Sequence, residues 1–233
     1  ADGSLFTEWI TITRVEDPSL DQIHYVSILS DISEQKAGQE RLRYMAYYDP
    51  LTELPNRAFS HEELRRSLTG ASVAHNQLCV MFLDLDNFKV INESLGHESG
   101  DQLLREVALR LRETLGTEGF IGRFAGDVFI IHLWVGAVER AGVLARSVLA
   151  CFNDNFHLDP HRNISVRASI GIALSKGNET GADDEISFLF SCADAALNEA
   201  KRRGRNTYAF HSQALTESAI RRLELEQALK EGI

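Results

Sequence analysis

Three aspartates of this chain occupy positions from which carboxylates could hold a metal ion. Asp84 and Asp86 close an apolar run in the segment D-L-D-N-F-K, and Asp127 lies between two further apolar runs. If these runs are neighbouring strands of one sheet, Asp84 and Asp127 meet at a single edge, as hard Mg²⁺ ions require for phosphoryl chemistry. A structural alternative stays open, since an acid at a strand end can be a solvated cap and an Asp beside Gly can serve a turn.

Basic side chains accompany these acids. Lys89 follows the first acidic segment, and Lys201, Arg202, Arg203 and Arg205 end the last long helical pattern. A triphosphate beside Mg²⁺ needs such cations. Cations at a helix C-terminus also complement the helix dipole, which is the structural alternative.

An amide and a carboxylate complete the candidate chemistry. Asn92 and Asp101 are the pair of side chains that suits the hydrogen-bonding edge of a guanine base. Asn92 could equally be a loop residue, and Asp101 could be the N-cap of the helix that follows it.

The elements that must position these residues can be inferred from hydrophobic patterning. Residues 5–13 and 23–30 are rich in β-branched and aromatic types and flank a turn-like D-P-S-L-D segment, which predicts a hairpin. Residues 33–48 are charged with Leu42, Met45 and Ala46 on one helical face, so we expect a connecting helix that ends before Asp49-Pro50.

From Leu78 onward the patterns of strands and helices alternate. Strands are predicted at 78–85, 120–124, 128–135, 164–174 and 208–210, with a single buried face for 164–174 and a hairpin turn at Ala125-Gly126-Asp127. Helices are predicted at 101–115, 138–152, 186–203 and 216–230. This order is typical of an α+β domain in which an antiparallel-centred sheet is covered by helices.

Charge and apolar content exclude several classes of function. The formal net charge of −10 disfavours a nucleic-acid partner and anionic membrane surfaces. The longest apolar stretch, Val128 to Val138, is interrupted by His132 and is shorter than the roughly 20 residues that span a bilayer. We expect no membrane segment in this chain.

The cysteines and the start of the chain indicate the compartment and the completeness of the sequence. Cys79, Cys151 and Cys192 lie far apart in apolar runs and read as reduced core residues, which favours the cytoplasm. No leader pattern opens the chain, which starts at Ala1 without methionine, so we expect a piece of a protein that is longer at both ends.

The order and spacing of six motifs resemble the GGDEF family of diguanylate cyclases, from about Asp49 to Phe210. The matching segments are D-x-L-T-x-L-P-N-R at Asp49–Arg57, D-x-D-x-F-K-x-I-N at Asp84–Asn92, G-H-x-x-G-D at Gly96–Asp101, S-I-G-I-A at Ser169–Ala173, A-D-x-A-L at Ala193–Leu197 and A-K-x-x-G-R-N at Ala200–Asn206. The resemblance implies the palm-like fold that this family shares with polymerases and class III nucleotide cyclases.

The resemblance also implies a reaction and a role for each matching residue. Two GTP molecules would be joined into cyclic di-GMP, with each 3′-hydroxyl attacking the other α-phosphate between two Mg²⁺ ions. By this carry-over Asp84, the Leu85 carbonyl and Asp127 would hold metal, Asn92 and Asp101 would bind guanine, and Lys89, Lys201 and Arg205 would hold the phosphates.

The signature loop departs from the pattern of the family. Ala125-Gly126-Asp127-Val128-Phe129 stands where two glycines, an acid, Glu and Phe are expected. Val128 can neither ligate Mg²⁺ nor accept a proton, and loss of an acid/base group alone costs about 10²- to 10⁴-fold in rate. Ala125 places a Cβ where the first glycine lets the backbone approach a nucleotide. Asp127 is retained, but no catalytic set is intact.

The product-inhibition motif of the family, R-x-x-D, is missing as well. Its Arg and Asp would fall on Gly116 and Gly119, so the sequence predicts that this inhibitory site is absent.

The flanking segments resemble parts of further signalling domains. D-I-S-E-Q-K at Asp31–Lys36 resembles the exit of a PAS sensory domain, and R-R-L-E-L-E-Q-A-L at Arg221–Leu229 resembles the helix that leads into an EAL-type cyclic di-GMP phosphodiesterase. The expected domains are the last strands of a PAS domain at 1–33, a linker helix at 34–48, the GGDEF domain at 49–212, and a linker helix toward an EAL-type domain at 213–233.

Three hypotheses of function follow. The favoured one is a catalytically silent regulatory module that binds GTP, with Mg²⁺ only where GTP is bound, and relays a signal from the PAS side to the EAL-type domain, with a homodimer as a further expected assembly. The second is a weakly active diguanylate cyclase. The third is an interaction or dimerisation scaffold that binds no nucleotide.

Overall fold

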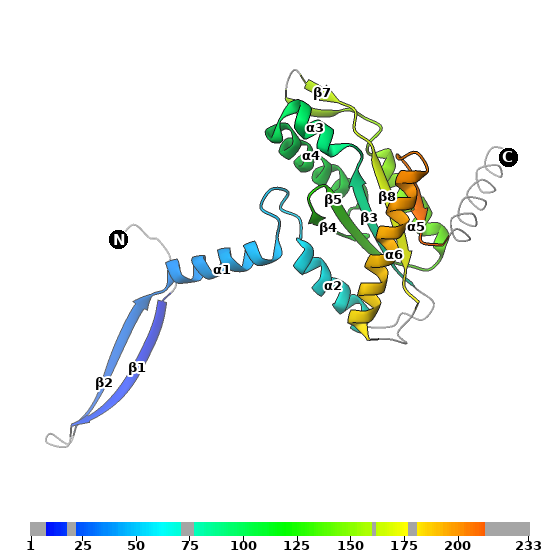
Figure 1. Ribbon diagram of the computed structural model, residues 1–233. Coiled ribbons are helices and arrows are strands. Elements are labelled where there is room, and N and C mark those ends of the chain that lie inside the picture. Colours follow the sequence, from blue (N-terminus) through cyan, green and yellow to red (C-terminus); the bar gives the residue numbers. More distant parts are fainter. Residues whose placement is uncertain (1–7, 18–21, 71–76, 160–161, 177–180, 213–233) are drawn as a thin grey trace, which may run out of the picture. The chain divides into compact units, whose positions relative to one another are not determined.

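The computed structural model describes residues 8–17, 22–70, 77–159, 162–176 and 181–212 of the chain (Figure 1). The chain divides into two compact units, residues 1–46 and 47–233, and each is described by itself. The helix predicted at 216–230 lies outside the described residues.

The first unit contains a long two-stranded hairpin. Strands β1 (Glu8–Asp17) and β2 (Gln22–Asp31) pair antiparallel, which confirms the predicted hairpin. Helix α1 (Ser33–Tyr47) follows at the predicted position, and the Asp31 carboxylate accepts a hydrogen bond from the Ser33 backbone N–H at its start. The apolar side chains of Trp9, Tyr25 and Ile28 are all exposed on this hairpin.

The second unit is an α+β domain with a five-stranded sheet, which confirms the predicted fold class. Its strands are β3 (Gln77–Leu85), β4 (Phe120–Ala125), β5 (Val128–Val135), β8 (Ala168–Leu174) and β9 (Tyr208–Phe210), in the order β4-β5-β3-β8-β9. All pairings are antiparallel except that of β8 with β9, which is parallel. Two short strands, β6 (Phe156–Asp159) and β7 (Arg162–Ile164), form a separate ribbon.

Helices cover both faces of this sheet (Figure 1). Helices α2 (Arg57–Thr69) and α6 (Ala182–Arg202) lie on one face, whereas α3 (Phe88–Leu95), α4 (His97–Leu115) and α5 (Val138–Ala150) lie on the other. The central strand β3 sends alternate side chains to the two sides, as the strand period requires. Val80 and Phe82 enter the core against α2 and α6, while Met81 and Leu83 enter the core against α4 and α5.

The segment 164–174 was predicted to be one strand with a single buried face, and the structure differs from this prediction. The structure splits it into β7 and β8, and β8 is buried on both faces. The small residues Ser169, Gly171 and Ala173 alternate with larger apolar ones and are buried as well. They face α6, where their small size permits close packing: a Cβ at Gly171 would lie 2.1 Å from the Ala193 carbonyl oxygen.

Several helix assignments also differ from the prediction. Helices α2 and α3 and the strand β6 were not predicted, and α4 begins at His97 with Gly96 at its N-cap. The alternative of Asp101 as an N-cap is therefore wrong, because Asp101 lies in the second turn of α4. Asn92 as a loop residue is also wrong, because it lies within α3.

The three cysteines have no disulfide partner in the part of the chain that the structure describes. Cys79 and Cys192 are buried and Cys151 is half-buried. Burial raises the pKa of the Cys151 thiol to about 11, so this side chain stays protonated at neutral pH. No described helix is long and apolar enough to cross a bilayer.

Candidate functional site

Asp84 lies near the C-terminal end of β3, on the face of the sheet that α6 covers. Side chains alternate along a strand, so Asp84 points to the same side of β3 as Val80 and Phe82. Its carboxylate therefore faces α6. There Lys201 Nζ lies 2.7 Å from Asp84 Oδ1. Burial raises the pKa of Asp84 above its ordinary value, against the opposing effect of Lys201. The structure thus places a buried carboxylate in contact with one cation.

Val128 is the direct cross-strand partner of Asp84. The register of the β3–β5 pair aligns Asp84 with Val128, and residues opposite each other in antiparallel strands have Cβ atoms about 4.5–5.5 Å apart. Val128 packs against the apolar core under α2 and α6 instead of presenting an oxygen to the edge. An acid at position 128 would face Asp84, so the structure places this valine beside the carboxylate of the candidate site.

Asp127 is the second carboxylate at this edge. It precedes Val128 in the turn between β4 and β5, its carbonyl oxygen accepts a hydrogen bond of 3.4 Å from the Leu85 N–H, and its charge contributes to the raised pKa of Asp84. The three positions proposed for metal, Asp84, Leu85 and Asp127, therefore lie together. Within the described residues, however, no three His, Cys, Asp or Glu side chains gather as a metal site. With Val128 and the Lys201 contact, the donors present do not fit a two-metal centre.

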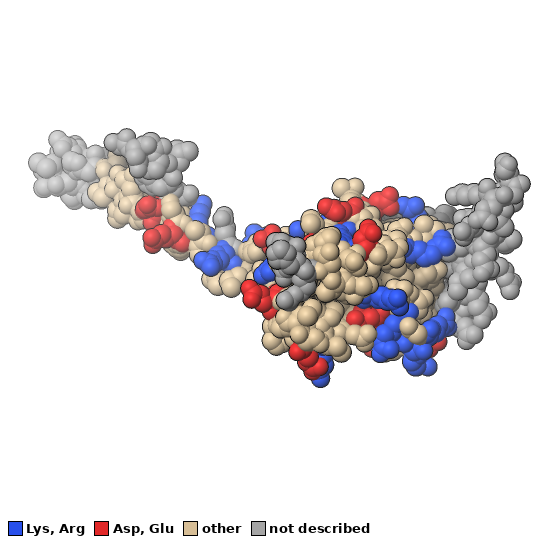
Figure 2. All heavy atoms as spheres, turned by 90° about the horizontal axis from the view of Figure 1, so that it is seen from above, with Lys and Arg blue, Asp and Glu red and all other residues tan. Residues whose placement is uncertain are grey.

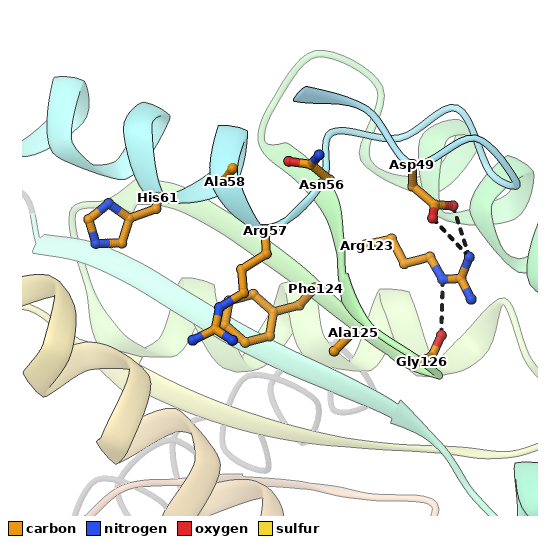
Figure 3. A pocket seen from close by; sticks show the side chains of 9 residues that line it. All are labelled: Asp49, Asn56, Arg57, Ala58, His61, Arg123, Phe124, Ala125 and Gly126. Carbon is orange, nitrogen blue, oxygen red and sulfur yellow. Dashed lines mark hydrogen bonds and ion pairs between the residues drawn. The ribbon is translucent and has the colours of Figure 1, made fainter. Parts of the chain in front are cut away.

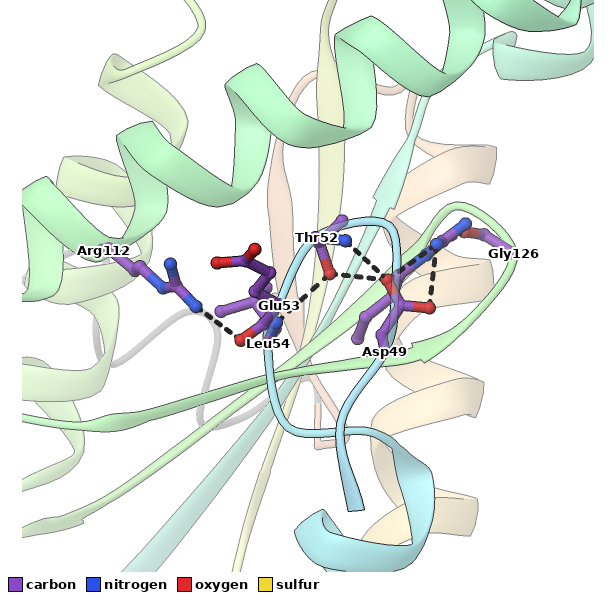
Figure 4. A network of polar contacts seen from close by, with 7 residues as sticks. Asp49, Thr52, Glu53, Leu54, Arg112 and Gly126 are labelled. Atoms are coloured by element: carbon purple, nitrogen blue, oxygen red, sulfur yellow. Dashed lines mark hydrogen bonds and ion pairs between the residues drawn. The ribbon is translucent and has the colours of Figure 1, made fainter. Parts of the chain in front are cut away.

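The β4–β5 turn is held by a polar network that begins in the D-x-L-T segment (Figure 4). Arg123 donates to both carboxylate oxygens of Asp49, at 2.9 and 3.0 Å, and its Nε donates to the Gly126 carbonyl at 2.9 Å. Asp49 also accepts hydrogen bonds from the Thr52 N–H and hydroxyl. Burial tends to raise the pKa of Asp49, but these hydrogen bonds outweigh it and the pKa is lowered. The loop before α2 thus fixes the position of the turn.

Ala125 and Gly126, the two residues of the signature loop before Asp127, differ in backbone conformation. Gly126 has φ of +53°, a left-handed conformation that glycine adopts without strain. Ala125 ends β4 and is exposed. Its Cβ is therefore compatible with the local fold.

The packing of α3 on α4 places Asn92 beside Gly100, the residue that precedes Asp101. A Cβ added at Gly100 would lie 1.9 Å from Asn92 Oδ1, so Asn92 lies against the residue that precedes Asp101. Asn92 Oδ1 is buried and accepts no hydrogen bond from the described residues. A buried acceptor without a donor is costly, and the N–H groups of a guanine edge would satisfy it.

The predicted phosphate-binding cations have less uniform positions. Lys89 is highly exposed and lies 3.7 Å from Glu93 on its own helix. Arg205 is exposed in the turn after α6, with φ of +64°. Arg202 and Arg203 pair with Glu199, one turn earlier in the same helix, at 2.5 and 2.7 Å. Of these five cations, Lys201 is the one that forms an ion pair with Asp84 among the described residues.

Asp86 has a structural role that the sequence did not indicate. Its buried carboxylate accepts hydrogen bonds from the Ser169 hydroxyl at 2.8 Å and from the Asn206 N–H at 3.0 Å. These bonds tie the turn after α6 to the end of β3. Arg167 was also missed by the sequence: it lines a cavity of about 380 Å³ together with Arg205. No motif marks Arg167, because only folding brings it beside that turn.

The segment expected to lack the inhibitory motif forms a shallow cavity of about 380 Å³ near Gly116. Arg140 and Glu118 form an ion pair of 2.7 Å beside it. With glycines at 116 and 119, the R-x-x-D pair is not formed there.

The surface charge is mixed despite the net negative charge. Figure 2 shows acidic and basic side chains interspersed on one face, with a local cluster of Lys and Arg. A basic locus on an acidic protein is compatible with an anionic small ligand.

Comparison with known proteins places this geometry in context. A family model described as "Diguanylate cyclase, GGDEF domain" matches residues 46–207. Signaling protein YkoW of Bacillus subtilis is 37% identical over 100% of this chain and 29% of its own length. Cyclic di-GMP phosphodiesterase NbdA of Pseudomonas aeruginosa is 36% identical over 82% of this chain and 24% of its own length. The chain spans from 20% to 38% of the length of such curated relatives.

Solved structures give the same result. The GGDEF domain of TpbB (YfiN) from Pseudomonas aeruginosa has a TM-score of 0.65 at 32% identity, covering 76% of this chain and 99% of that chain. The coiled coil and GGDEF domain of DgcB from Caulobacter crescentus, in complex with c-di-GMP, has a TM-score of 0.65 at 28% identity, covering 77% of this chain and 93% of that chain.

Proposed function

This chain belongs to the GGDEF family, the diguanylate cyclase domain of cyclic di-GMP signalling proteins, and we propose that it is a catalytically silent regulatory module that binds GTP. The observation that carries the proposal is the cross-strand pair of Asp84 and Val128, with Lys201 in contact with the remaining acid. In a cyclase, two Mg²⁺ ions would stabilise the entering and leaving oxygens. A valine at this position supplies no anion for that purpose.

The residues that would bind GTP are largely present. The buried Asn92 Oδ1 would accept a hydrogen bond from the guanine edge, and Asp101 would accept a second one. Lys201, Arg205 and Lys89 would neutralise phosphate oxygens. Asp84 and Asp127, with the Leu85 carbonyl, remain for a single Mg²⁺ carried in with the nucleotide. Binding without turnover would make GTP an effector of this domain.

The neighbouring domains belong to the same proposal. We propose that residues 1–33 are the last strands of a PAS domain, that 34–48 form a linker helix, that the GGDEF domain occupies 49–212, and that 213–233 lead toward an EAL-type domain. The exposed apolar face of the β1–β2 hairpin supports the first part, because two strands alone are not independently stable. The similarity to the phosphodiesterase NbdA supports the last part. The module would act in the cytoplasm, and assemble as a homodimer if the two-monomer site of the family forms.

A weakly active diguanylate cyclase is the second candidate. It is favoured by the convergence of Asp84 and Asp127, since two carboxylates and water can still hold one Mg²⁺. A scaffold that binds no nucleotide is the third hypothesis. Calorimetry with GTP and Mg²⁺ separates the first and third, because only a binder releases heat saturably.

Activity is tested by restoring the acid. We expect no accumulation of cyclic di-GMP from the chain incubated with GTP and Mg²⁺, and its appearance in Val128→Glu, with a gain of about 10²- to 10⁴-fold over background. Val128→Gln is the matched control, because it fills the same space without charge and should stay inactive. Cyclic di-GMP production by the unchanged chain would make the second candidate correct. A silent Val128→Glu variant would show that the loss at position 128 does not explain inactivity.

A further inference from the structure

A cavity larger than the two described above lies at the edge of the sheet, beside the edge strand β4 and the start of α2. Its volume is about 880 Å³, within the range of small-molecule sites. Figure 3 shows its walls, which include Asn56, Arg57, His61, Phe124 and Ala125. None of Asp84, Asn92, Asp101 and Lys201 lines it. The cavity is therefore separate from the site proposed for GTP.

The cavity carries an uncompensated positive charge. No carboxylate of the described residues lies within ion-pair distance of Arg57, which is exposed on the cavity wall. The one acid in the wall, Asp49, is already engaged by both oxygens with Arg123. A ligand that enters this space meets a free guanidinium, which favours an anion, and phosphate matches the planar donor geometry of arginine well.

The free guanidinium lies above an aromatic ring that is held in place. The Arg57 Cζ atom is 4.8 Å from the centroid of Phe124. Phe124 in turn contacts Phe82 and Phe190, with ring centroids 4.8 and 5.2 Å apart. The Arg57 guanidinium thus makes a cation–π contact with this ring while the residue stays exposed on the cavity wall, where a planar group of a ligand can reach it. This cavity therefore favours a ligand that is both planar and negatively charged.

A second ring lies on the same side of helix α2. His61 follows Arg57 by four residues, so both side chains lie on one face of the helix. His61 lines the cavity and contacts Phe190 edge-on, with centroids 6.2 Å apart. The opposite wall consists of Ala125 and Gly126 of the signature turn. An occupant would contact that turn from the outside.

We propose that this cavity binds a nucleoside phosphate, with the phosphate held by Arg57 and the base packed beside the rings of Phe124 and His61. The site goes beyond the proposed function, since it uses none of the side chains assigned to guanine, phosphate or metal and borders the signature loop through Ala125 and Gly126. Its contact with Ala125 and Gly126 provides a direct route from an occupant to the signature hairpin.

Calorimetric titration of the 233-residue chain with AMP, GMP and sodium phosphate in a chelating buffer tests the proposal. AMP and GMP should both bind saturably and more tightly than phosphate. Arg57→Gln should weaken AMP binding about tenfold or more, since it removes a charge-assisted hydrogen bond. Arg66→Gln, an exposed arginine on the same helix outside the cavity, and Lys201→Gln, in the GTP site, should bind AMP as the unchanged chain does.

A second variant distinguishes loss of the binding site from loss of the folded structure. Ala58→Trp fills the cavity from another exposed wall position, and should also abolish AMP binding while the circular dichroism spectrum is retained. Absence of saturable AMP binding, or loss of it in Lys201→Gln but not in Arg57→Gln, would overturn the proposal without touching the GTP-binding hypothesis. Equal affinity for phosphate and AMP would overturn the assignment to a nucleoside phosphate. The separate titration with GTP and Mg²⁺ reports on the proposed function alone.

Discussion

At the scale of single residues, one substitution changes the electrostatics of the candidate site. A Glu at position 128 would face Asp84 across two strands, and like charges at that distance require a cation between them. Val128 removes that requirement, and Lys201 alone lies in ion-pair contact with Asp84 among the described residues. The Asp84 carboxylate therefore faces one cation, Lys201, on one side and the apolar Val128 on the other.

Asp84 should cost stability at neutral pH. Its pKa in the folded chain is raised above the ordinary aspartate value of 3.8, mainly by burial. The contribution of this group to stability is therefore greatest below pH 3.8 and is lost as the pH rises through the folded pKa. We expect Asp84→Asn to unfold at a midpoint no lower than that of the unchanged chain at pH 7, and the difference to shrink toward pH 4. Thermal unfolding at both pH values measures this, and a large loss at pH 7 would contradict it.

His132 should make the domain sensitive to acid. Its imidazole is buried, stacks on Phe120, and has no hydrogen-bond partner for Nε2 among the described residues. Burial lowers its pKa from 6.5 to about 3, so its contribution to stability is present above pH 6.5 and is lost as the pH falls toward 3. From pH 7 to pH 5 this loss amounts to about 2 kcal/mol.

Denaturant unfolding of His132→Phe at pH 7 and pH 5 checks this prediction. Phenylalanine keeps the aromatic contact and cannot titrate, so the variant should lose about 2 kcal/mol less between the two pH values. The same comparison with the exposed His211→Asn serves as the control and should resemble the unchanged chain. Equal losses in all three proteins would contradict the assignment.

At the scale of elements, the approach of α6 to β8 positions Lys201 against Asp84. Gly171 permits this approach, because a Cβ there would lie 2.1 Å from the Ala193 carbonyl oxygen and 2.2 Å from the Leu197 backbone nitrogen. Backbone atoms cannot rotate away as a side chain can. The helix that carries the cation is therefore seated by a residue without a side chain.

Gly171→Ala should move α6 away from the sheet. We expect a loss of roughly 3 kcal/mol in the free energy of unfolding, the upper part of the range for overpacked cores. Gly181→Ala is the matched control, since a Cβ there meets only a side-chain atom at 3.9 Å. Denaturant unfolding of both variants measures the difference. A Gly171→Ala variant as stable as Gly181→Ala would show that the helix can shift without cost.

At the scale of the whole molecule, the apolar core belongs to the second unit. All of its buried hydrophobic residues lie between Leu54 and Phe210, within the described part of the chain. Tyr47 and Tyr48 still pack on Phe59, whereas the β1–β2 hairpin exposes its apolar side chains. The two units should therefore be independent in stability.

Removal of residues 1–46 should leave the thermal midpoint of the GGDEF domain unchanged. The deletion removes no residue of either core cluster. Calorimetry of residues 47–233 beside the whole chain measures this. A midpoint lower by more than about 4 °C, the shift expected for about 1–2 kcal/mol in a domain of this size, would show that the first unit stabilises the second.

Much of the fold could be predicted because strand patterning is local. The continuous apolar run of β3, the hairpin of β4 and β5, and the helical spacing of α5 and α6 were each apparent in the sequence. Helix α2 was not, because much of its surface is polar and its start depends on a single capping residue, Asn56. Helix α3 was not predicted either: Phe88, Ile91 and Leu95 recur at helical spacing and pack against the core, but the helix has only eight residues and none of them is fully buried.

The candidate site was only partly predictable. The sequence by itself determined which residue types are present: two acids, a valine where the family resemblance leads us to expect an acid, and the amide, carboxylate and cations that we propose for a nucleotide site. Only the tertiary structure decided that Val128 stands opposite Asp84, that Lys201 contacts that carboxylate, and that Arg57 lines a cavity without a carboxylate partner among the described residues. The sequence gives the identity of each side chain directly. Residues 84, 128 and 201 come together only through strand register and helix packing, and both of these depend on contacts between segments that lie far apart in the chain.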